Sequence, residues 1–430
     1  MAGRRILVVG AGFAGLYAAR GLRRLTEAGH RVTVVNAENF MQYQPFLPEV
    51  ASGTIDPRAV VVPLRPILRH AEVHVGEVTA IDHGDRTAVV AMAGGAERRL
   101  AYDVLVLAAG STSRVLPIPG LVEHGIGFKT VQEAIHLRNR VLSQLDVAAA
   151  VEDPERRRAA LTFVFVGGGY AGVEALGELE DLARDAVRAY PTLDARELRW
   201  VLVDAAPQIL PELGADLAGY ATERLRERRI EVRTDTRLAS YEDRVVRLST
   251  GETFAADTLV WTAGVRPAGL ARIAGFEVDG SGRVLADEYL RIRGADDAWA
   301  AGDAASVPDR TTGGTMPPTA QHGMRQGRHL ARNLTAWLEG GRIEPFVYRD
   351  IGSVCSLGRY KGVATISGIK LRGFPAWFAH RSYHLYAMPT LSRKAKIATD
   401  WTVALLFPRD LAQLGSLQRP FDPFERAAGA

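Results

Sequence analysis

The sequence of 430 residues contains a single cysteine, Cys355, and no uninterrupted apolar run near the roughly 20 residues that a membrane-spanning helix needs. One thiol cannot form a disulfide or a redox-active pair within a chain, so mechanisms that need two thiols are excluded. A strand is expected to begin at Ile6, which leaves no room for a signal peptide before it. We therefore expect a cytoplasmic protein without transmembrane helices.

One pattern occurs twice: a strand rich in β-branched residues runs into a glycine turn that opens a helix. The first copy lies at residues 6–15 and the second at residues 163–172. Helical patterns follow each turn, and further matched strands are predicted at 32–36 and 200–204 and at 102–110 and 256–264. With 47% hydrophobic residues, the chain can also bury a large core. The sequence predicts an α/β fold with two Rossmann-like dinucleotide-binding domains, one inserted in the other.

The glycines of each turn have distinct expected roles. The first permits the tight turn, the second lets the backbone approach a pyrophosphate, and the third allows close packing of helix on strand. The helix start adds unpaired N–H groups for the phosphates. A single bare match equally fits a turn without a ligand, but two complete matches disfavour that alternative. The residues expected to hold dinucleotides are Gly10, Gly12, Phe13, Ala14, Gly15, Ala109 and Gly110 in the first copy, and Gly167, Gly169, Tyr170, Gly172 and Gly264 in the second.

The strand after each turn ends in a residue that can bond a ribose, Asn36 in the first copy and Asp204 in the second. A carboxylate accepts hydrogen bonds from both ribose hydroxyls and repels a 2′-phosphate, and Ala205 and Ala206 supply no cation to attract one. We therefore expect the second copy to prefer NADH to NADPH. Asn36 can bond a ribose without the charge, and the alternative is that it only caps the strand end.

Residues 298–305 resemble the third flavin motif of flavoproteins with two dinucleotide-binding domains. The resemblance implies that Gly302 and Asp303 contact FAD, with the aspartate on the ribityl chain, and that the first copy holds FAD non-covalently. An ordinary strand-to-helix turn is the alternative. The expected regions are an FAD-binding domain at 1–115 and 282–335, an NADH-binding domain at 116–281, and a C-terminal membrane-surface or dimerisation region at 336–430.

Three further stretches resemble type II NADH:quinone oxidoreductase, the non-pumping NADH dehydrogenase of membrane surfaces. Residues 43–53 are similar to the family's Phe-Gln-Pro-Leu-Leu-Tyr run, 317–321 to its Ala-Gln quinone motif, and 352–377 to its C-terminal region. Related disulfide reductases and sulfide:quinone oxidoreductases use cysteines that this chain lacks. The resemblance covers essentially the whole chain. It implies that FAD takes hydride from NADH and passes two electrons to menaquinone or ubiquinone.

The resemblance also implies roles for individual residues. Glu174 matches a family carboxylate near the flavin, and we expect it in the first turn of a helix, as a proton relay or as an acid that only favours the helix start. Gln321 matches the glutamine of the quinone motif, and we expect it to contact a cofactor as well. Gln44 is a further expected cofactor contact. The family's second Gln is replaced by Arg325, which can still donate to a quinone oxygen but adds charge. No metal site is expected.

Residues 351–399 contain no Asp or Glu but eight Lys and Arg, interleaved with aromatic residues. This composition suits attachment to an anionic bilayer, and the apolar stretch 401–407 is too short to span one. A solvated basic surface over a domain or dimer core is the alternative; no recognised module supports nucleic-acid binding. With the quinone motif, we expect a homodimer on the inner face of the cell membrane. His380, Arg381 and Tyr383 are additional candidates for the quinone mouth.

Two other functions fit the same sequence. One is an NADH-dependent reductase of a soluble quinone-like metabolite. The replacement of the family's second Gln by Arg325 favours this function. The other is a flavoprotein that binds a partner in response to NADH and resembles apoptosis-inducing-factor proteins. The basic, aromatic C-terminal segment favours the membrane quinone instead.

The C-terminal segment leads to the first prediction. High salt, or removal of the residues after about Gly373, is expected to release the protein from anionic liposomes, because salt screens the attraction between cations and lipid headgroups. Co-sedimentation with the vesicles measures the bound fraction. Unchanged binding of the truncated chain would reject the assignment.

Overall fold

The computed structural model describes residues 3–348 and 351–413. The chain forms two compact units, each built from three separate segments. Unit 1 comprises Met1–Tyr43, Val61–Thr112 and Val265–Asp350, and unit 2 comprises Gln44–Val60, Ser113–Gly264 and Ile351–Ala430. Two short strands, β9 (Ser111–Ser113) and β18 (Val265–Pro267), lie where the chain passes between the units.

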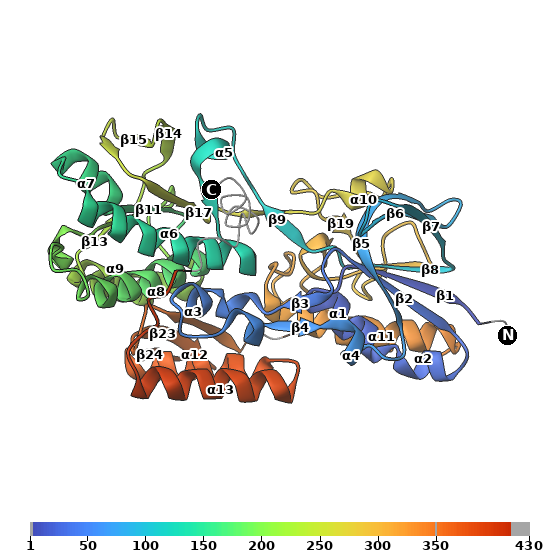
Figure 1. Ribbon diagram of the computed structural model, residues 1–430. Coiled ribbons are helices and arrows are strands. Elements are labelled where there is room, and N and C mark those ends of the chain that lie inside the picture. Colours follow the sequence, from blue (N-terminus) through green and yellow to red (C-terminus); the bar gives the residue numbers. More distant parts are fainter. Residues whose placement is uncertain (1–2, 349–350, 414–430) are drawn as a thin grey trace, which may run out of the picture. The chain divides into compact units, whose positions relative to one another are not determined.

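Unit 1 is built on a seven-stranded sheet (Figure 1). Its order is β20 (Ala298–Ala300), β8 (Val104–Leu107), β1 (Arg5–Val9), β2 (Arg31–Asn36), β5 (Glu72–Asp82), β6 (Thr87–Met92) and β7 (Glu97–Ala101). The first five strands are parallel, and β6 and β7 continue the sheet antiparallel. All four residues of β8 are buried, as expected for a strand covered on both faces. The smaller elements are α2 (Arg23–Glu27), β3 (Phe40–Gln42), β4 (Val61–Pro63), α4 (Leu64–Ile67), α10 (Leu270–Ile273), β19 (Val284–Leu285), η5 (Gly302–Ala304) and β21 (Ala305–Ser306).

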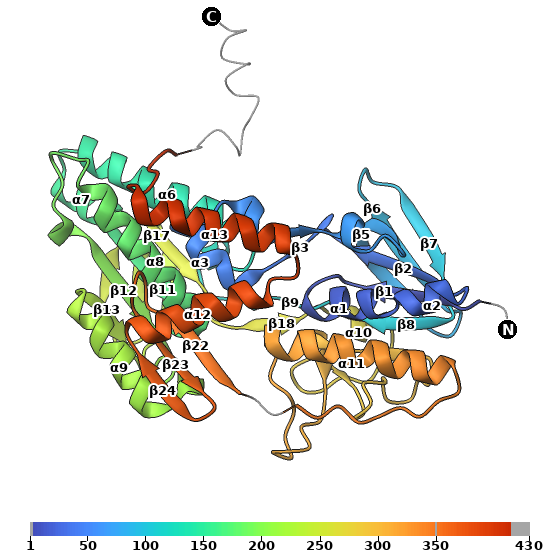
Figure 2. The ribbon, with the colours of Figure 1, turned by 90° about the horizontal axis from the view of Figure 1, so that it is seen from below.

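Two helices of unit 1, α1 (Phe13–Gly21) and α11 (Ala320–Leu338), lie side by side (Figure 2). Their backbones meet at small residues. A Cβ added to Gly327 would lie 2.2 Å from the carbonyl oxygen of Ala14, and one added to Gly21 would lie 2.5 Å from the Cβ of Ala331. Any larger side chain at these glycines would therefore separate the helices.

Unit 2 contains a five-stranded parallel sheet with the order β10 (Ile126–Gly127), β17 (Thr258–Trp261), β11 (Thr162–Val166), β12 (Arg199–Val203) and β13 (Ile230–Arg233). An antiparallel sheet of β14 (Leu238–Glu242), β15 (Val245–Leu248) and β16 (Thr253–Ala255) adjoins it. The helices of these segments are α3 (Leu47–Ala51), α5 (Leu121–His124), α6 (Val131–Ala150), α7 (Pro154–Ala160), α8 (Tyr170–Val187) and α9 (Gly214–Glu227). A capping box starts α6, in which Thr130 and Glu133 satisfy each other's backbone N–H groups.

The C-terminal part of unit 2 is a second antiparallel sheet followed by two helices. The sheet comprises β22 (Gly352–Ser356), β23 (Gly362–Ile366) and β24 (Ile369–Arg372), and the helices are α12 (Phe374–Ala387) and α13 (Leu391–Leu406). Helix α12 packs on β22 and β23, and β22 packs on α8. In the ranges 3–348 and 351–413, no helix combines the length and the apolar character that a membrane crossing requires.

The predicted strands and the two dinucleotide folds are confirmed, but the compact units differ from the expected boundaries. Residues 44–60 belong to unit 2, and the chain returns to unit 1 at Val265 instead of residue 282. The expected C-terminal region, 336–430, is divided at residue 350 between unit 1 and unit 2, and within unit 2 β22 packs on α8 and α12 packs on β22 and β23. Its residues 349–350 and 414–430 lie outside the described part of the chain.

Candidate functional site

The glycine turn of unit 1 connects β1 to α1. Gly10 has a φ of +90°, and a Cβ there would lie 2.3 Å from the carbonyl oxygen of Ala108. A Cβ on Gly15 would lie 1.9 Å from the carbonyl oxygen of Gly10, so only glycine lets the helix start this close to the strand. A Cβ on Gly12 would meet nothing within 4 Å. The backbone beside Gly12 is therefore open to a ligand.

The turn between β11 and α8 in unit 2 repeats this arrangement. Gly167 has a φ of +121°, and a Cβ on Gly172 would lie 1.9 Å from the carbonyl oxygen of Gly167. A Cβ on Gly169 would again meet nothing within 4 Å. Open backbone beside a helix start suits a pyrophosphate, so both turns fit a dinucleotide.

The two predicted ribose-binding residues also shape their own turns. The side-chain oxygen of Asn36 accepts a hydrogen bond from the Ala11 N–H at 2.8 Å, while its amide donates to the Glu38 carbonyl at 2.8 Å. Asn36 thus does cap the strand end, and its ribose contact stays a prediction. The Asp204 carboxylate accepts from the N–H groups of Gly168 and Ala206. These bonds hold a negative charge beside the second turn.

The third flavin-like motif lies next to the first glycine turn in unit 1. A Cβ on Gly302 would lie 2.9 Å from the Cβ of Ala14. The Gly302 N–H donates to the side chain of Gln326 at 2.7 Å, and Asp303 accepts from the Ser111 hydroxyl at 2.6 Å. Gln326 is buried, and its part in holding this motif is not apparent from the sequence, where it is only the neighbour of Arg325.

Gln321 and Arg325 belong to one polar cluster at the start of α11. Arg325 donates to the Gln321 carbonyl at 3.1 Å and lies 4.4 Å from the centre of the Tyr348 ring. The Tyr348 hydroxyl donates to the Gln321 side-chain oxygen at 3.1 Å. Tyr348 is not among the residues that the sequence points to, because it is 27 residues from Gln321 and no local pattern links the two.

Glu174 is buried in α8, just beyond the first turn of the helix where it is expected. The helix begins at Tyr170 and has no acidic residue in its first turn, so the predicted favourable interaction with the helix start is wrong. The Glu174 carboxylate instead accepts from the Ser356 N–H at 3.0 Å and lies 3.0 Å from Nε2 of His380. Burial by itself lowers the pKa of His380, but the Glu174 carboxylate outweighs it, and the net shift is upward.

A second buried ion pair joins α3 to α12. Arg381 donates to the Glu49 carboxylate at 2.8 Å, and Trp401 donates to the same oxygen at 2.7 Å. The guanidinium also lies over the rings of Trp377 and Trp401, 4.2 and 4.8 Å from their centres. Burial raises the pKa of Glu49 against the opposing effect of Arg381. The charge of Arg381 is thus satisfied inside unit 2, which argues against its expected place at a quinone mouth.

The predicted site residues divide between the two units. Unit 1 holds Gly10, Gly12, Phe13, Ala14, Gly15, Asn36, Ala109, Gly110, Gly302, Asp303, Gln321 and Arg325, and unit 2 holds Gln44, Gly167, Gly169, Tyr170, Gly172, Glu174, Asp204 and Gly264. Gln44, an expected cofactor contact, donates to the Lys129 carbonyl of unit 2 at 3.4 Å, and its contact with a cofactor stays a prediction. Cys355 is buried in β22, and burial raises its pKa well above the usual range, which disfavours the reactive thiolate.

Residues 4–327 match the model of the pyridine nucleotide-disulphide oxidoreductase family, and the chain belongs to this class of two-dinucleotide flavoenzymes. A type II NADH:quinone oxidoreductase of Mycobacterium tuberculosis is 31% identical over 94% of this chain and 89% of its own. One of Staphylococcus aureus is 30% identical over 87% and 92%. Within the class, the chain belongs to the type II NADH:quinone oxidoreductases.

Solved structures agree on the fold. NDH2 from Plasmodium falciparum in complex with NADH superposes with a TM-score of 0.89 at 16% identity, over 95% of this chain and 99% of that one. The sulfide:quinone oxidoreductase of Aquifex aeolicus gives a TM-score of 0.71 at 17% identity, over 94% of each chain. At such low identity these likenesses show the fold alone.

The different surroundings of the glycines in the first turn lead to a paired prediction. Gly15→Ala is expected to destabilise the fold by about 2–3 kcal/mol, because the added methyl overlaps backbone. Gly12→Ala is expected to change folding stability by less than about 0.5 kcal/mol, because its Cβ meets open space. It should still weaken FAD binding at least about tenfold by blocking backbone approach. Thermal unfolding of the apoprotein and flavin titration measure the two effects. Normal FAD affinity in the Gly12 variant would contradict this role.

Proposed function

We propose that this chain oxidises NADH and reduces a membrane quinone by two electrons, using non-covalent FAD and without pumping protons. The two open glycine turns support the proposal most directly, because they fit two dinucleotides in a chain of this family. In the balanced reaction, one NADH, one proton and one quinone are converted to one NAD⁺ and one quinol. Bound FAD supplies the centre that accepts two electrons and returns them singly or in pairs.

The residues of unit 1 are proposed to hold FAD. The N–H groups at the start of α1 and the open backbone at Gly12 would receive the pyrophosphate, and Asp303 would bond the ribityl chain. Unit 2 is proposed to exchange NADH at the corresponding turn, with the charge of Asp204 selecting against a 2′-phosphate.

Glu174 and His380 are proposed to hold the proton that quinone reduction consumes. His380 is 3% exposed, its raised pKa favours the protonated ring, and Nε2 faces the Glu174 carboxylate. Although Nε2 lies 3.0 Å from the Glu174 oxygen, neither ring nitrogen has a partner with hydrogen-bond geometry among the described residues. A carboxylate and an imidazole in contact can pass a proton between them without a large rearrangement.

The cluster of Gln321, Arg325 and Tyr348 is proposed to bind the quinone headgroup. A guanidinium can stabilise the negative charge that develops on a quinone oxygen during reduction. The ring of Tyr348 orients that guanidinium without neutralising it. Arg325 would therefore replace the hydrogen bond of the family's second Gln by a charged one.

The C-terminal helices are proposed to attach unit 2 to the bilayer through exposed apolar side chains as well as through charge. Of the eight cations counted in the sequence, Lys370 and Arg372 pair with Asp216, and Arg381 pairs with Glu49. Large apolar residues are also exposed on α12, on α13 and just beyond: Phe374, Phe378, Tyr386, Leu391, Val403, Leu405, Leu406 and Phe407. Exposed apolar surface of this extent is typical of an interaction face. Inner-face location and homodimerisation stay predictions.

Stopped-flow measurement tests the proposed function. The flavin of the purified protein is expected to be reduced rapidly by NADH and much more slowly by NADPH, because of Asp204. It should then be reoxidised rapidly by a menaquinone or ubiquinone analogue. Slow reoxidation by every quinone would reject the membrane-quinone assignment, and rapid reoxidation by polar soluble quinones alone would favour the soluble-metabolite alternative.

Replacing Glu174 by Gln tests the proton step. Reduction by NADH is expected to change little, whereas reoxidation by quinone should slow about 10- to 100-fold. Without the carboxylate the pKa of His380 falls, so the ring loses its proton at lower pH and the decline of reoxidation with rising pH should begin earlier. Glu223→Gln, an exposed change on α9, is the matched control. An unshifted pH profile in the Glu174 variant would exclude this role.

A further inference from the structure

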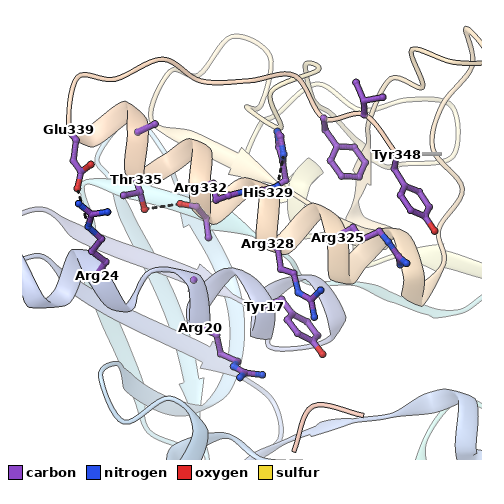
Figure 3. Close-up of a pocket in the computed structure, with 15 residues that line it drawn as sticks. Tyr17, Arg20, Arg24, Arg325, Arg328, His329, Arg332, Thr335, Glu339 and Tyr348 are labelled. Atoms are coloured by element: carbon purple, nitrogen blue, oxygen red, sulfur yellow. Dashed lines mark hydrogen bonds and ion pairs between the residues drawn. The ribbon is translucent and has the colours of Figure 1, made fainter. Parts of the chain in front are cut away.

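An open groove of about 950 Å³ lies within unit 1, lined by α1, α2, α11 and the segment that follows α11 (Figure 3). Its lining is strongly basic. Five arginines contribute to it against one carboxylate, that of Glu339. The five are Arg20, Arg24, Arg325, Arg328 and Arg332.

Aromatic rings, more than carboxylates, orient the arginines of the groove. The Arg328 guanidinium lies 4.5 Å from the centre of the Tyr17 ring, and that of Arg325 lies 4.4 Å from the Tyr348 ring (Figure 3). The contact of Arg24 with Glu339 is long, at 4.0 Å, and both side chains are exposed. Because a ring orients a guanidinium without cancelling its charge, the groove keeps a large positive excess.

The backbone brings these charges together. Gly21 and Ala331 let α1 and α11 approach closely, so arginines from both helices line one groove. His329, which also lines the groove, donates from Nε2 to the Glu344 carbonyl oxygen at 2.8 Å, and burial lowers its pKa. Convergent guanidinium groups on two rigid helices form a preorganised receptor for a phosphate, which guanidinium forks bind through paired hydrogen bonds.

We propose that this arginine groove binds the phosphate of an anionic phospholipid headgroup. The inference rests on the proposed function through Arg325 and Tyr348, which line the groove and also belong to the proposed quinone cluster. A membrane quinone would enter this cluster from a bilayer. The groove, which shares residues with the cluster, would then lie close to the lipid headgroups. Val347, 59% exposed in the groove lining, adds an apolar surface suited to the lipid's glycerol and acyl region. This lipid contact belongs to unit 1, whereas the exposed apolar helices α12 and α13 belong to unit 2.

The test uses the full-length, FAD-loaded protein and phosphatidylcholine vesicles with or without phosphatidylglycerol. Arg20→Gln/Arg328→Gln removes two exposed groove charges and spares Arg325. Arg98→Gln/Arg99→Gln, on exposed positions of β7, makes the same change of charge elsewhere in unit 1. The groove variant is expected to bind phosphatidylglycerol vesicles about 25-fold more weakly, since each cation near an anionic surface contributes roughly fivefold. The control should lose less than about threefold.

An equal loss of vesicle binding in both variants would show that only the net charge of the protein matters, and would overturn the proposal. Vesicle binding of the groove variant at the wild-type level would overturn it as well. Inorganic pyrophosphate at matched ionic strength tests the other source of phosphate. If it binds the wild type, fails to bind the groove variant and leaves vesicle binding intact, the groove is a soluble-anion site and the lipid assignment is wrong. Turnover of a short-chain quinone in detergent-free solution reports on the proposed function separately, because that assay needs no vesicle.

Discussion

The contact between the first and third glycines of each dinucleotide turn is the constraint on which the rest of the structure depends. In both units, a Cβ on the third glycine would lie 1.9 Å from the carbonyl oxygen of the first. This contact sets the helix directly against the strand and leaves the second glycine open to a ligand. In unit 1 the same helix carries Tyr17 and Arg20 to the arginine groove, and in unit 2 it carries Glu174 to His380.

The two copies of the dinucleotide-binding fold differ in the elements that pack on their first helices, and this difference gives them different functional residues. In unit 1, α11 lies against α1 through glycines, so its polar face stays available for Gln321 and Arg325. In unit 2, α8 is 18 residues long, against nine in α1, and β22 and α3 pack against it. That packing buries carboxylates, which must then find partners: Glu174 meets His380, and Glu178 accepts from Ser52.

Charge has opposite consequences in the two units. Some cations in the C-terminal part of unit 2 form ion pairs within the unit, including the buried pair of Arg381 and Glu49. The exposed surface of its last helices is largely apolar. The arginines of the unit 1 groove face rings and one distant carboxylate, so they remain available to an external anion. A count of charges along the sequence cannot separate these cases, because a paired and an unpaired arginine look alike there.

The sequence by itself determined the duplicated α/β fold, the strands and the glycines of both turns, because these depend on local steric rules and on residues that alternate or recur at short range. The expected preference of Asp204 for NADH has the same local origin. Only the tertiary structure decided that Glu174 meets His380, that Tyr348 meets Gln321, and that arginines of α1 and α11 share one groove. It also assigned residues 44–60 and the C-terminal segment to unit 2. These features join positions far apart in the chain, and their partners are selected by packing and by the need to satisfy buried charge, which no local pattern records.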